Sequence, residues 1–145
     1  LVGRNTAGTS IDCYALAAVT AVQYAGGLVG YNGPNCDCVV TIPSVVGRCY
    51  AAGPVRGANA GGLVARNYRS NVELSFWDTQ ATGCTASSGG EGKTTVQMQG
   101  LALYLAAGWD FVAESANGAK DLWYLPGPGS YPRLTWELPP VSPQQ

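Results

Sequence analysis

The sequence contains no histidine, and only 12% of its 145 residues are charged. Without histidine there is no Ser-His-Asp or Cys-His triad and no histidine ligand for zinc. A net charge of −1 offers no basic face to neutralise phosphates, which argues against nucleic acid as a partner and against a polybasic membrane-surface segment. No apolar run approaches the ~20 residues of a transmembrane helix, so we expect no membrane insertion.

Glycine (20 residues) and apolar residues dominate instead, and 46% of the chain is hydrophobic. Four tryptophans and eight tyrosines need an interior to pack in, so the chain is expected to fold. Five cysteines are many for a cytosolic protein and ordinary for a secreted one, which favours an oxidising compartment. The chain opens within a repeated pattern at Leu1, without a methionine or a signal-type apolar stretch, and is interpreted as a processed product or a fragment of a longer protein.

The sequence repeats itself. A Leu-Val-(Gly/Ala)-x-Asn box occurs three times, at 1–5, 28–32 and 63–67, and a pair of glycines precedes the second and third copies. A second box comes after each copy, at 12–15, 48–51 and, in diverged form, 74–77. The middle repeat carries an insertion at about 33–44, which holds Cys36 and Cys38. Regular repetition of these boxes indicates the architecture more strongly than local secondary-structure propensity does.

Each box is a short alternating stretch bounded by Gly, Asn or Pro, which is typical of a strand followed by a turn. Several such strands per repeat, without hairpin signals, favour parallel stacking over a β-sandwich. We therefore expect an all-β fold, a right-handed parallel β-solenoid of about three coils over residues 1–92. A small C-terminal cap at 93–138, with one short helix (about 95–107) and short aromatic-rich strands, and a Pro-rich tail at 139–145 complete the predicted domains.

Stacked coils would place equivalent residues in rows, about 4.8 Å apart. We expect an inward aliphatic row of Leu1, Leu28 and Leu63. We also expect a ladder of side-chain amides formed by Asn5, Asn32 and Asn67. Two further rows are predicted on the outside: a cation–π stack of Arg4, Tyr31 and Arg66, and an opposite-charge pair of Asp12 and Arg48.

Several segments resemble the GLUG repeat family of bacterial secreted adhesins and IgA-peptidase-like surface proteins. They are the heptapeptide at 26–32, the Cys-Tyr-Ala boxes at 13–15 and 49–51, the stretches at 75–83 and 89–99, and the segments at 108–111 and 131–137, which resemble the region after the last repeat in such proteins. The chain departs from the repeat at Ala65 and in the insertion. The resemblance implies a structural rather than catalytic role.

The cysteines could pair or stack. Cys36 and Cys38 lack a second pair at zinc-finger spacing, so a disulfide from one of them to Cys84, or intermolecular pairing, is favoured over a metal site. Cys13 and Cys49 are interpreted as a buried row of thiols, because small apolar thiols suit the interior of a coil. A bond between them is the alternative, although it is geometrically demanding. The glycine-rich stretch at 87–94 is not a P-loop, because Ser87 stands where the first glycine is required.

The nine acidic residues are scattered, which disfavours a catalytic β-helix with paired carboxylates. Asp78 and Asp110 each come directly after a tryptophan, and we expect them to make turn or cap hydrogen bonds. Exposed rings at Trp77, Trp109 or Trp123 could instead stack on sugars. No catalytic residue, metal site or cofactor is assigned.

These features predict a non-catalytic structural or adhesive module that stacks head-to-tail into a surface-associated fibre. The alternative is a glycan-binding or spacer module of a larger secreted adhesin or enzyme. The expected partners are further copies of the chain or upstream repeats of a longer one, together with cell-surface or matrix glycans. The expected location is extracellular, on the surface of a bacterial or archaeal cell.

Overall fold

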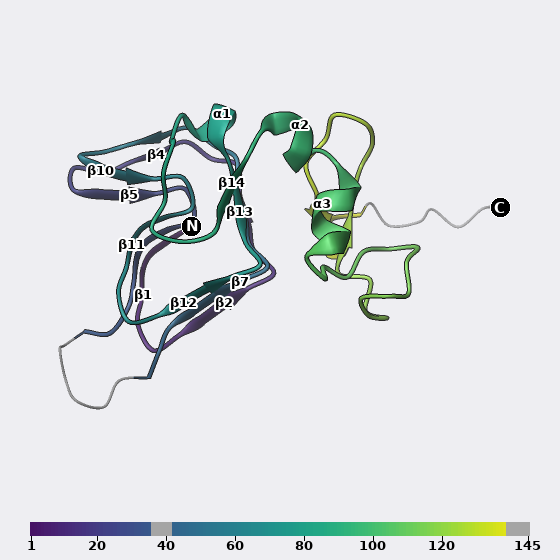
Figure 1. Cartoon of the computed structure of the whole chain (residues 1–145), viewed down its shortest axis with the longest axis horizontal. Coiled ribbons are helices and arrows are strands. Elements are labelled where there is room, and N and C mark those ends of the chain that lie inside the picture. The colour runs from purple at the N-terminus through teal and green to yellow at the C-terminus, as the bar shows by residue number, and fades with distance from the viewer. Residues whose placement is uncertain (36–41, 139–145) are drawn as a thin grey trace. The chain divides into compact units, whose positions relative to one another are not determined.

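A computed structural model describes residues 1–35 and 42–138 (Figure 1). The chain divides into two compact units, Leu1–Met98 and Gln99–Gln145. The predictions made for Cys36, Cys38 and the tail at 139–145 fall outside the described residues.

The first unit is built from short strands in parallel sheets. Its strands are β1 (Val2–Asn5), β2 (Thr9–Ile11), β3 (Tyr14–Ala15), β4 (Val19–Thr20), β5 (Tyr24–Gly26), β6 (Val29–Asn32), β7 (Val45–Gly47), β8 (Tyr50–Ala51), β9 (Val55–Arg56), β10 (Asn59–Gly61), β11 (Val64–Asn67), β12 (Asn71–Glu73), β13 (Phe76–Asp78) and β14 (Glu91–Lys93). They pair in the orders β1-β6-β11, β2-β7-β12, β3-β8-β13-β14, β4-β9 and β5-β10. An all-β unit with parallel sheets is therefore confirmed.

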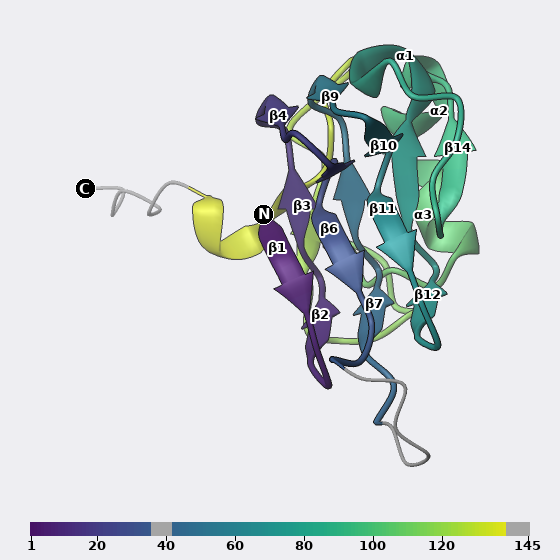
Figure 2. The same cartoon turned by 90° about the vertical axis from the view of Figure 1, so that its left-hand side faces the viewer.

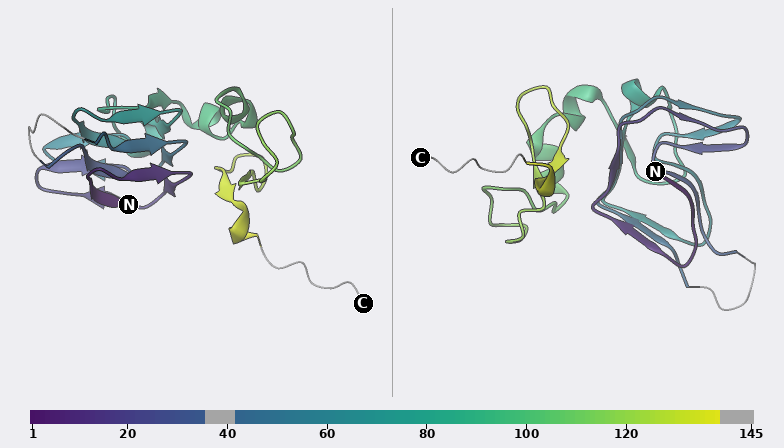
Figure 3. Two further views of the ribbon diagram at one scale, coloured as in Figure 1. Left: turned by 90° about the horizontal axis from the view of Figure 1, so that it is seen from below. Right: turned by 180° about the vertical axis from the view of Figure 1, so that it is seen from behind.

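Neighbouring strands come from successive passes of the chain, which Figure 2 shows side by side and Figure 3 shows as stacked layers. In the first sheet Val2 pairs with Val29 and Val29 with Val64. In the longest sheet Tyr14 pairs with Tyr50, which pairs with Phe76. The boxes that align in the sequence are thus the strands that pair in space.

The interior of the first unit is a cluster of small and branched apolar side chains. Its buried members are Ala15, Leu28, Val29, Val46, Cys49, Ala51, Leu63, Val64 and Trp77. Each fully buried Leu contributes ~1.5–3 kcal/mol relative to an exposed one. Leu28 and Leu63 lie inward as predicted, but Leu1 is 69% exposed. It precedes the edge strand β1, and no further row of described residues covers it.

The paired glycines permit a close approach between passes. A Cβ built on Gly62 would overlap the ring of Trp77, and one built on Gly27 would overlap the carbonyl oxygen of Gly62. The indole of Trp77 therefore fits inside the unit only because Gly62 has no side chain.

The three asparagines form a continuous ladder at one corner. Asn5 Nδ2 donates to Asn32 Oδ1 at 2.9 Å, and Asn32 Nδ2 donates to Asn67 Oδ1 at 2.8 Å. Each amide nitrogen also reaches a backbone carbonyl, those of Val45, Asn71 and Ser70 respectively. Asn32 is fully buried, so these bonds satisfy polar atoms that water cannot reach.

Two other corners turn through left-handed backbone without glycine. Asp12, Arg48 and Leu74, which hold equivalent places before the second box, have φ values of 51°, 47° and 48°. Ala7 and Arg69, each two residues past a ladder asparagine, have φ values of 50° and 48°. A residue with a side chain at positive φ costs ~1–2 kcal/mol of conformational energy, which the paired strands on either side of the corner must offset.

The expected helix at about 95–107 is two short helices. A capping box of Thr94 and Gln97 opens α2 (Thr95–Met98): Gln97 N donates to Thr94 Oγ1 at 3.3 Å, and Thr94 N donates to Gln97 Oε1 at 2.9 Å. The helix then breaks, because Gly100 adopts an extended conformation with φ −98° and ψ 125°. It precedes α3 (Leu101–Ala106), which belongs to the second unit.

The second unit packs α3 and a small antiparallel pair, β15 (Trp123–Tyr124) and β16 (Arg133–Leu134), around buried aromatic rings. The ring centroids of Trp109 and Trp123 lie 4.7 Å apart, and Tyr104 contacts Trp109 at 4.9 Å. Phe111 makes a single isolated bridge with Trp123 rather than forming part of a strand. A 3-10 helix, Thr135–Glu137, ends the described part.

We predict that Asn32→Ala lowers the free energy of unfolding by about 2–4 kcal/mol, because it removes three hydrogen bonds and leaves ladder atoms unpaired in the interior. Urea denaturation followed by circular dichroism measures the change. Asn59→Ala is the matched control: Asn59 is exposed and its amide reaches only the Gln23 carbonyl, so we expect a change below about 0.5 kcal/mol. Equal effects of the two substitutions would refute a structural role for the ladder.

We also predict that Leu74→Gly stabilises the fold by about 0.5–1 kcal/mol, because glycine adopts positive φ without the Cβ clash and the Leu74 side chain is 53% exposed. Thermal unfolding measures the shift. Val22→Gly serves as control, since Val22 is 95% exposed and its φ is not positive, and it should destabilise the protein slightly. A loss of stability from Leu74→Gly as large as that from Val22→Gly would contradict this expectation.

Candidate functional site

The acidic residues singled out from the sequence serve the backbone. Asp78 Oδ1 accepts hydrogen bonds from the amides of Gln80 and Ala81 at 2.9 and 2.8 Å and so caps α1 (Thr79–Thr82). Asp110 accepts from the amides of Lys120 and Asp121 at 3.0 and 3.1 Å. Both carboxylates are buried in these roles, as predicted. Within residues 1–35 and 42–138, no group of three or more cysteine or acidic side chains could hold a metal ion.

The glycine-rich stretch at 87–94 contains a strand rather than a phosphate-binding loop. Lys93 ends β14, its ammonium lies 2.7 Å from Glu91 Oε2, and it stands 5.8 Å from the centre of the Phe76 ring. A lysine already paired with a carboxylate is poorly placed to bind phosphate.

The three tryptophans expected to stack on sugars are buried. Trp77 is 6% exposed and donates its indole N–H to the Cys84 carbonyl at 3.3 Å, while Trp109 and Trp123 are fully buried in the second unit. That expectation is therefore corrected, because none of the three rings presents a face to solvent. Trp136, at 78% exposed, is the exposed tryptophan of the described residues.

The thiols of Cys13, Cys49 and Cys84 are free, which corrects the expectation of a disulfide at Cys84. Cys13 and Cys49 directly precede the paired residues Tyr14 and Tyr50, so they lie next to each other where β3 and β8 begin. The predicted buried row is correct for Cys49 but not for Cys13, which is half-buried because β3 is an edge strand. A hydrogen bond from the Cys49 thiol lowers the pKa of Cys13 from 9.0 to about 7, and the same bond together with burial raises the pKa of Cys49. Burial raises the pKa of Cys84.

The outer face of the β1-β6-β11 sheet carries a strip of arginine and tyrosine. The guanidinium carbons of Arg4 and Arg66 lie 4.7 and 5.7 Å from the centre of the Tyr31 ring. Arg66 also lies 5.8 Å from the centre of the Tyr24 ring and donates to its hydroxyl at 3.1 Å. We call Arg4, Tyr31, Arg66 and Tyr24 the Arg–Tyr strip. The contribution of Tyr24 could not be read from the repeats, since its paired residue is Asn59.

Other rows also match across passes. Arg48 makes a two-point bond to the Asp12 carboxylate at 2.8 and 2.9 Å. The rings of Tyr14 and Tyr50 stack with centroids 5.2 Å apart and an angle of 7° between their planes. Complementary or like side chains therefore meet at these two rows.

The two ends of the parallel sheets differ. At the end reached last by the chain, the Ser87 hydroxyl accepts hydrogen bonds from the amides of Leu63 and Val64 at 3.2 and 2.9 Å, and the Ser88 amide donates to the Val64 carbonyl at 2.9 Å. β14 covers β13 in the neighbouring sheet. This end is therefore covered at β11 by side chains and at β13 by a strand, whereas β9, β10 and β12 have no further strand partner among the described residues. The Ser-Ser pair at 87–88 is the sequence feature that could have indicated this cap, but it lies outside the repeated boxes.

At the opposite end, β1, β2, β3 and β4 are edge strands with no partner on their outer side among the described residues. An apolar hollow of about 220 Å³ opens there, lined by Leu1, Val2, Gly3, Val19, Ala21, Tyr24, Gly26 and Gly30. The asparagine ladder runs one way, so no described asparagine donates to the Asn5 amide oxygen. This end presents unpaired strand edges beside an apolar depression.

Comparisons with known proteins found one distant similarity. A curated protein of Evansella cellulosilytica, named "Putative Gly-rich membrane protein", is 29% identical over 111 residues, which cover 74% of this chain and 12% of that protein. No family model matches the chain, and no solved structure matches it. No helix in the described part is long and apolar enough to cross a membrane.

We predict that alkylation of Cys13 by iodoacetamide rises with pH to a midpoint near 7, because the thiolate is the reactive form. Peptide mass spectrometry over a pH series gives the midpoint for each cysteine. Cys49→Ala removes the donor that stabilises the thiolate and should move the midpoint toward 9, whereas Cys84→Ala should leave it unchanged. A Cys13 midpoint near 9 in the unsubstituted chain would disprove the coupling.

Proposed function

We propose that this chain is a non-catalytic structural and adhesive module whose first unit is a right-handed β-solenoid of about three coils. The observation that carries the proposal is the set of matched rows, above all the asparagine ladder. Such rows stabilise the stacking of coils and supply no convergent reactive groups. The side chains of these rows thus use their hydrogen bonds to hold neighbouring coils together.

We propose further that the module is secreted and displayed at the surface of a bacterial or archaeal cell, as the resemblance to GLUG repeats suggests. The similar Evansella protein is named a membrane protein, and the matched stretch covers only 12% of its length. This supports the second form of the proposal, in which the chain is a spacer within a much longer surface protein.

Stacking onto a further coil is the proposed mode of assembly. The unpaired edges of β1 to β4 can accept strands, and the Asn5 amide oxygen can accept the next bond of the ladder. The hollow beside Leu1 offers apolar surface for burial. The other end is covered at β11 by Ser87 and at β13 by β14. The proposed occupant of the β1 to β4 edges is either a coil of the same chain upstream or a segment of another copy.

The proposal excludes turnover. Asp78 and Asp110 already accept backbone hydrogen bonds, and Lys93 is already paired with Glu91. Hydrolysis of a polysaccharide or nucleotide that disappeared on substitution of one of these residues, with the fold intact, would overturn the non-catalytic interpretation.

We predict that Ala21→Lys abolishes self-association of the chain, because it places a charge in the apolar hollow. Ala21 also packs against Ala25 and Val55, so circular dichroism must show that the variant is folded. Electron microscopy and light scattering at several concentrations measure association. Val22→Lys is the matched control, since Val22 is 95% exposed and does not line the hollow.

Two results would count against head-to-tail stacking. One is a monodisperse monomer for the unsubstituted chain at every concentration. The other is equal association of both lysine variants, which would show that contact does not use the hollow. A monomer would leave stacking onto upstream repeats, testable by adding one further repeat before Leu1 and measuring the rise in unfolding midpoint.

A further inference from the structure

The charges of the first unit are separated by sheet. Arg48 and Lys93 pair with Asp12 and Glu91. The acidic residues Glu73, Asp78 and Glu91 lie on β12, β13 and β14. By contrast Arg4 and Arg66 lie on β1 and β11, and no described carboxylate lies on any strand of that sheet.

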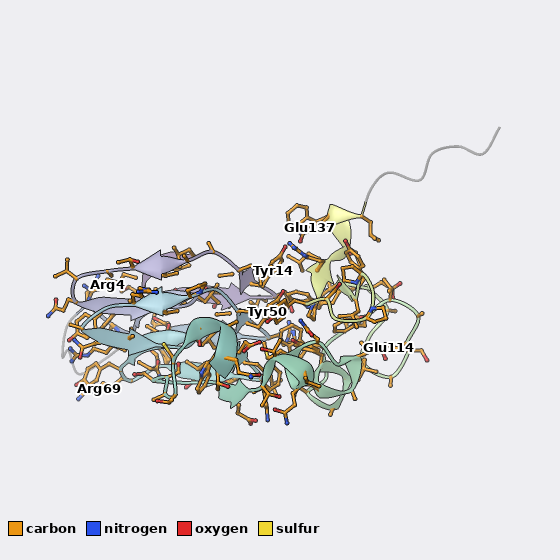
Figure 4. All side chains as sticks on the ribbon, turned by 90° about the horizontal axis from the view of Figure 1, so that it is seen from above. Arg4, Tyr14, Tyr50, Arg69, Glu114 and Glu137 are labelled. Carbon is orange, nitrogen blue, oxygen red and sulfur yellow. The ribbon has the colours of Figure 1, made fainter. Side chains whose placement is uncertain are left out.

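A further arginine lies near the Arg–Tyr strip. Arg69 comes after β11, and its guanidinium carbon lies 5.2 Å from the centre of the Tyr68 ring. Figure 4 shows Arg4 and Arg69 at the same end of the first unit, away from Tyr14 and Tyr50. Arg4, Arg66 and Arg69 are all exposed, and no ion pair joins any of them to a described carboxylate. One face therefore carries cations that no carboxylate of the described residues neutralises.

The two guanidiniums of the strip are held in place before any ligand arrives. Tyr31 lies between them, and Arg4 also donates from Nε to the Thr6 hydroxyl at 3.2 Å and from a terminal nitrogen to the Pro34 carbonyl at 3.4 Å. Arg66 is fixed by Tyr24. Stacking on tyrosine leaves the charge of arginine intact and reduces the conformational entropy that it loses on binding.

We propose that the Arg–Tyr strip binds an acidic polysaccharide, a linear polymer with carboxylates or sulfates spaced along it. Arg4 and Arg66 are two strands apart, which separates their rows by about 9–10 Å across the sheet. A polymer lying across β1, β6 and β11 meets one guanidinium, then the Tyr31 edge, then the second guanidinium. Polymers charged on alternate sugars suit this spacing. This inference rests on the proposed adhesive function and names its ligand class.

The same geometry disfavours nucleic acid. Single-stranded nucleic acid is bound by aromatic rings on which bases stack, but both faces of the Tyr31 ring are turned to guanidiniums. Duplex DNA carries one charge per ~1.7 Å of its axis and needs a dense basic surface. A few arginines in a chain of net charge −1 match a sparsely charged polymer instead.

The experiment measures binding of the full chain to hyaluronan, which carries one carboxylate per disaccharide, by biolayer interferometry at low salt. The same polymer with its carboxylates reduced to alcohols is the neutral comparison. We expect the Arg4→Gln/Arg66→Gln double variant to bind hyaluronan about tenfold more weakly than the unsubstituted chain. Binding should vanish near 1 M salt, where the Debye length is about 3 Å.

Matched variants distinguish binding by the Arg–Tyr strip from binding by overall charge and from self-association. Arg56→Gln removes an equally exposed arginine on β9, outside the strip, and should change binding less than twofold. Tyr31→Leu keeps both charges but removes the platform and should weaken binding. Ala21→Lys replaces no residue of the strip, although Tyr24 also lines the hollow, and Val22→Lys adds the same charge outside it. An association-deficient Ala21→Lys chain that binds hyaluronan as well as Val22→Lys shows that the ligand inference stands without self-association.

Three outcomes would overturn the proposal. The first is equal binding of the carboxylate-reduced polymer. The second is an equal loss of binding in Arg56→Gln and in the double variant when circular dichroism shows both folded. The third is tighter binding of single-stranded DNA than of hyaluronan at the same salt concentration, which would assign the strip to nucleic acid.

Discussion

Every row of side chains in the first unit depends on the parallel hydrogen bonding that places equivalent residues of successive passes opposite each other. Val2, Val29 and Val64 pair in one sheet, while Tyr14 and Tyr50 pair in another. A shift of one residue in either sheet would turn each outward side chain to the interior. The ladder of Asn5, Asn32 and Asn67 acts against such a shift, because its buried amides bond to one another only in this register.

The same register brings chemically matched groups together. The Asp12 carboxylate meets the Arg48 guanidinium, and the guanidinium of Arg4 meets the ring of Tyr31. It also places Cys13 against Cys49, where one thiol lowers the pKa of the other. Structural stacking and surface properties therefore have one origin, and a substitution that alters a row acts on both.

Polarity along the stack results from how the chain ends its last pass. Ser87 and β14 satisfy the edges of β11 and β13, whereas β1 to β4 keep their outer edges unpaired among the described residues. Parallel sheets gain most when each strand has two neighbours. The unpaired edges of β1 to β4 and the apolar hollow beside them are the surface on which the proposed stacking rests.

Alignment of the three boxes in the sequence was enough to predict the parallel pairing, the asparagine ladder and the Asp12–Arg48 pair, because residues at equivalent places in a repeat must meet when repeats stack. The burial of Leu28 and Leu63 was predicted in the same way, but the burial or exposure of other residues was not. Trp77 fits in the interior because Gly62 lacks a side chain, Leu1 is exposed because no row of described residues covers it, and the helix breaks where Gly100 extends. Ser87 caps β11 from outside the repeats. Spacing determines which residues are neighbours within the repeats, but exposure depends on segments remote in sequence, and only tertiary structure brings those together.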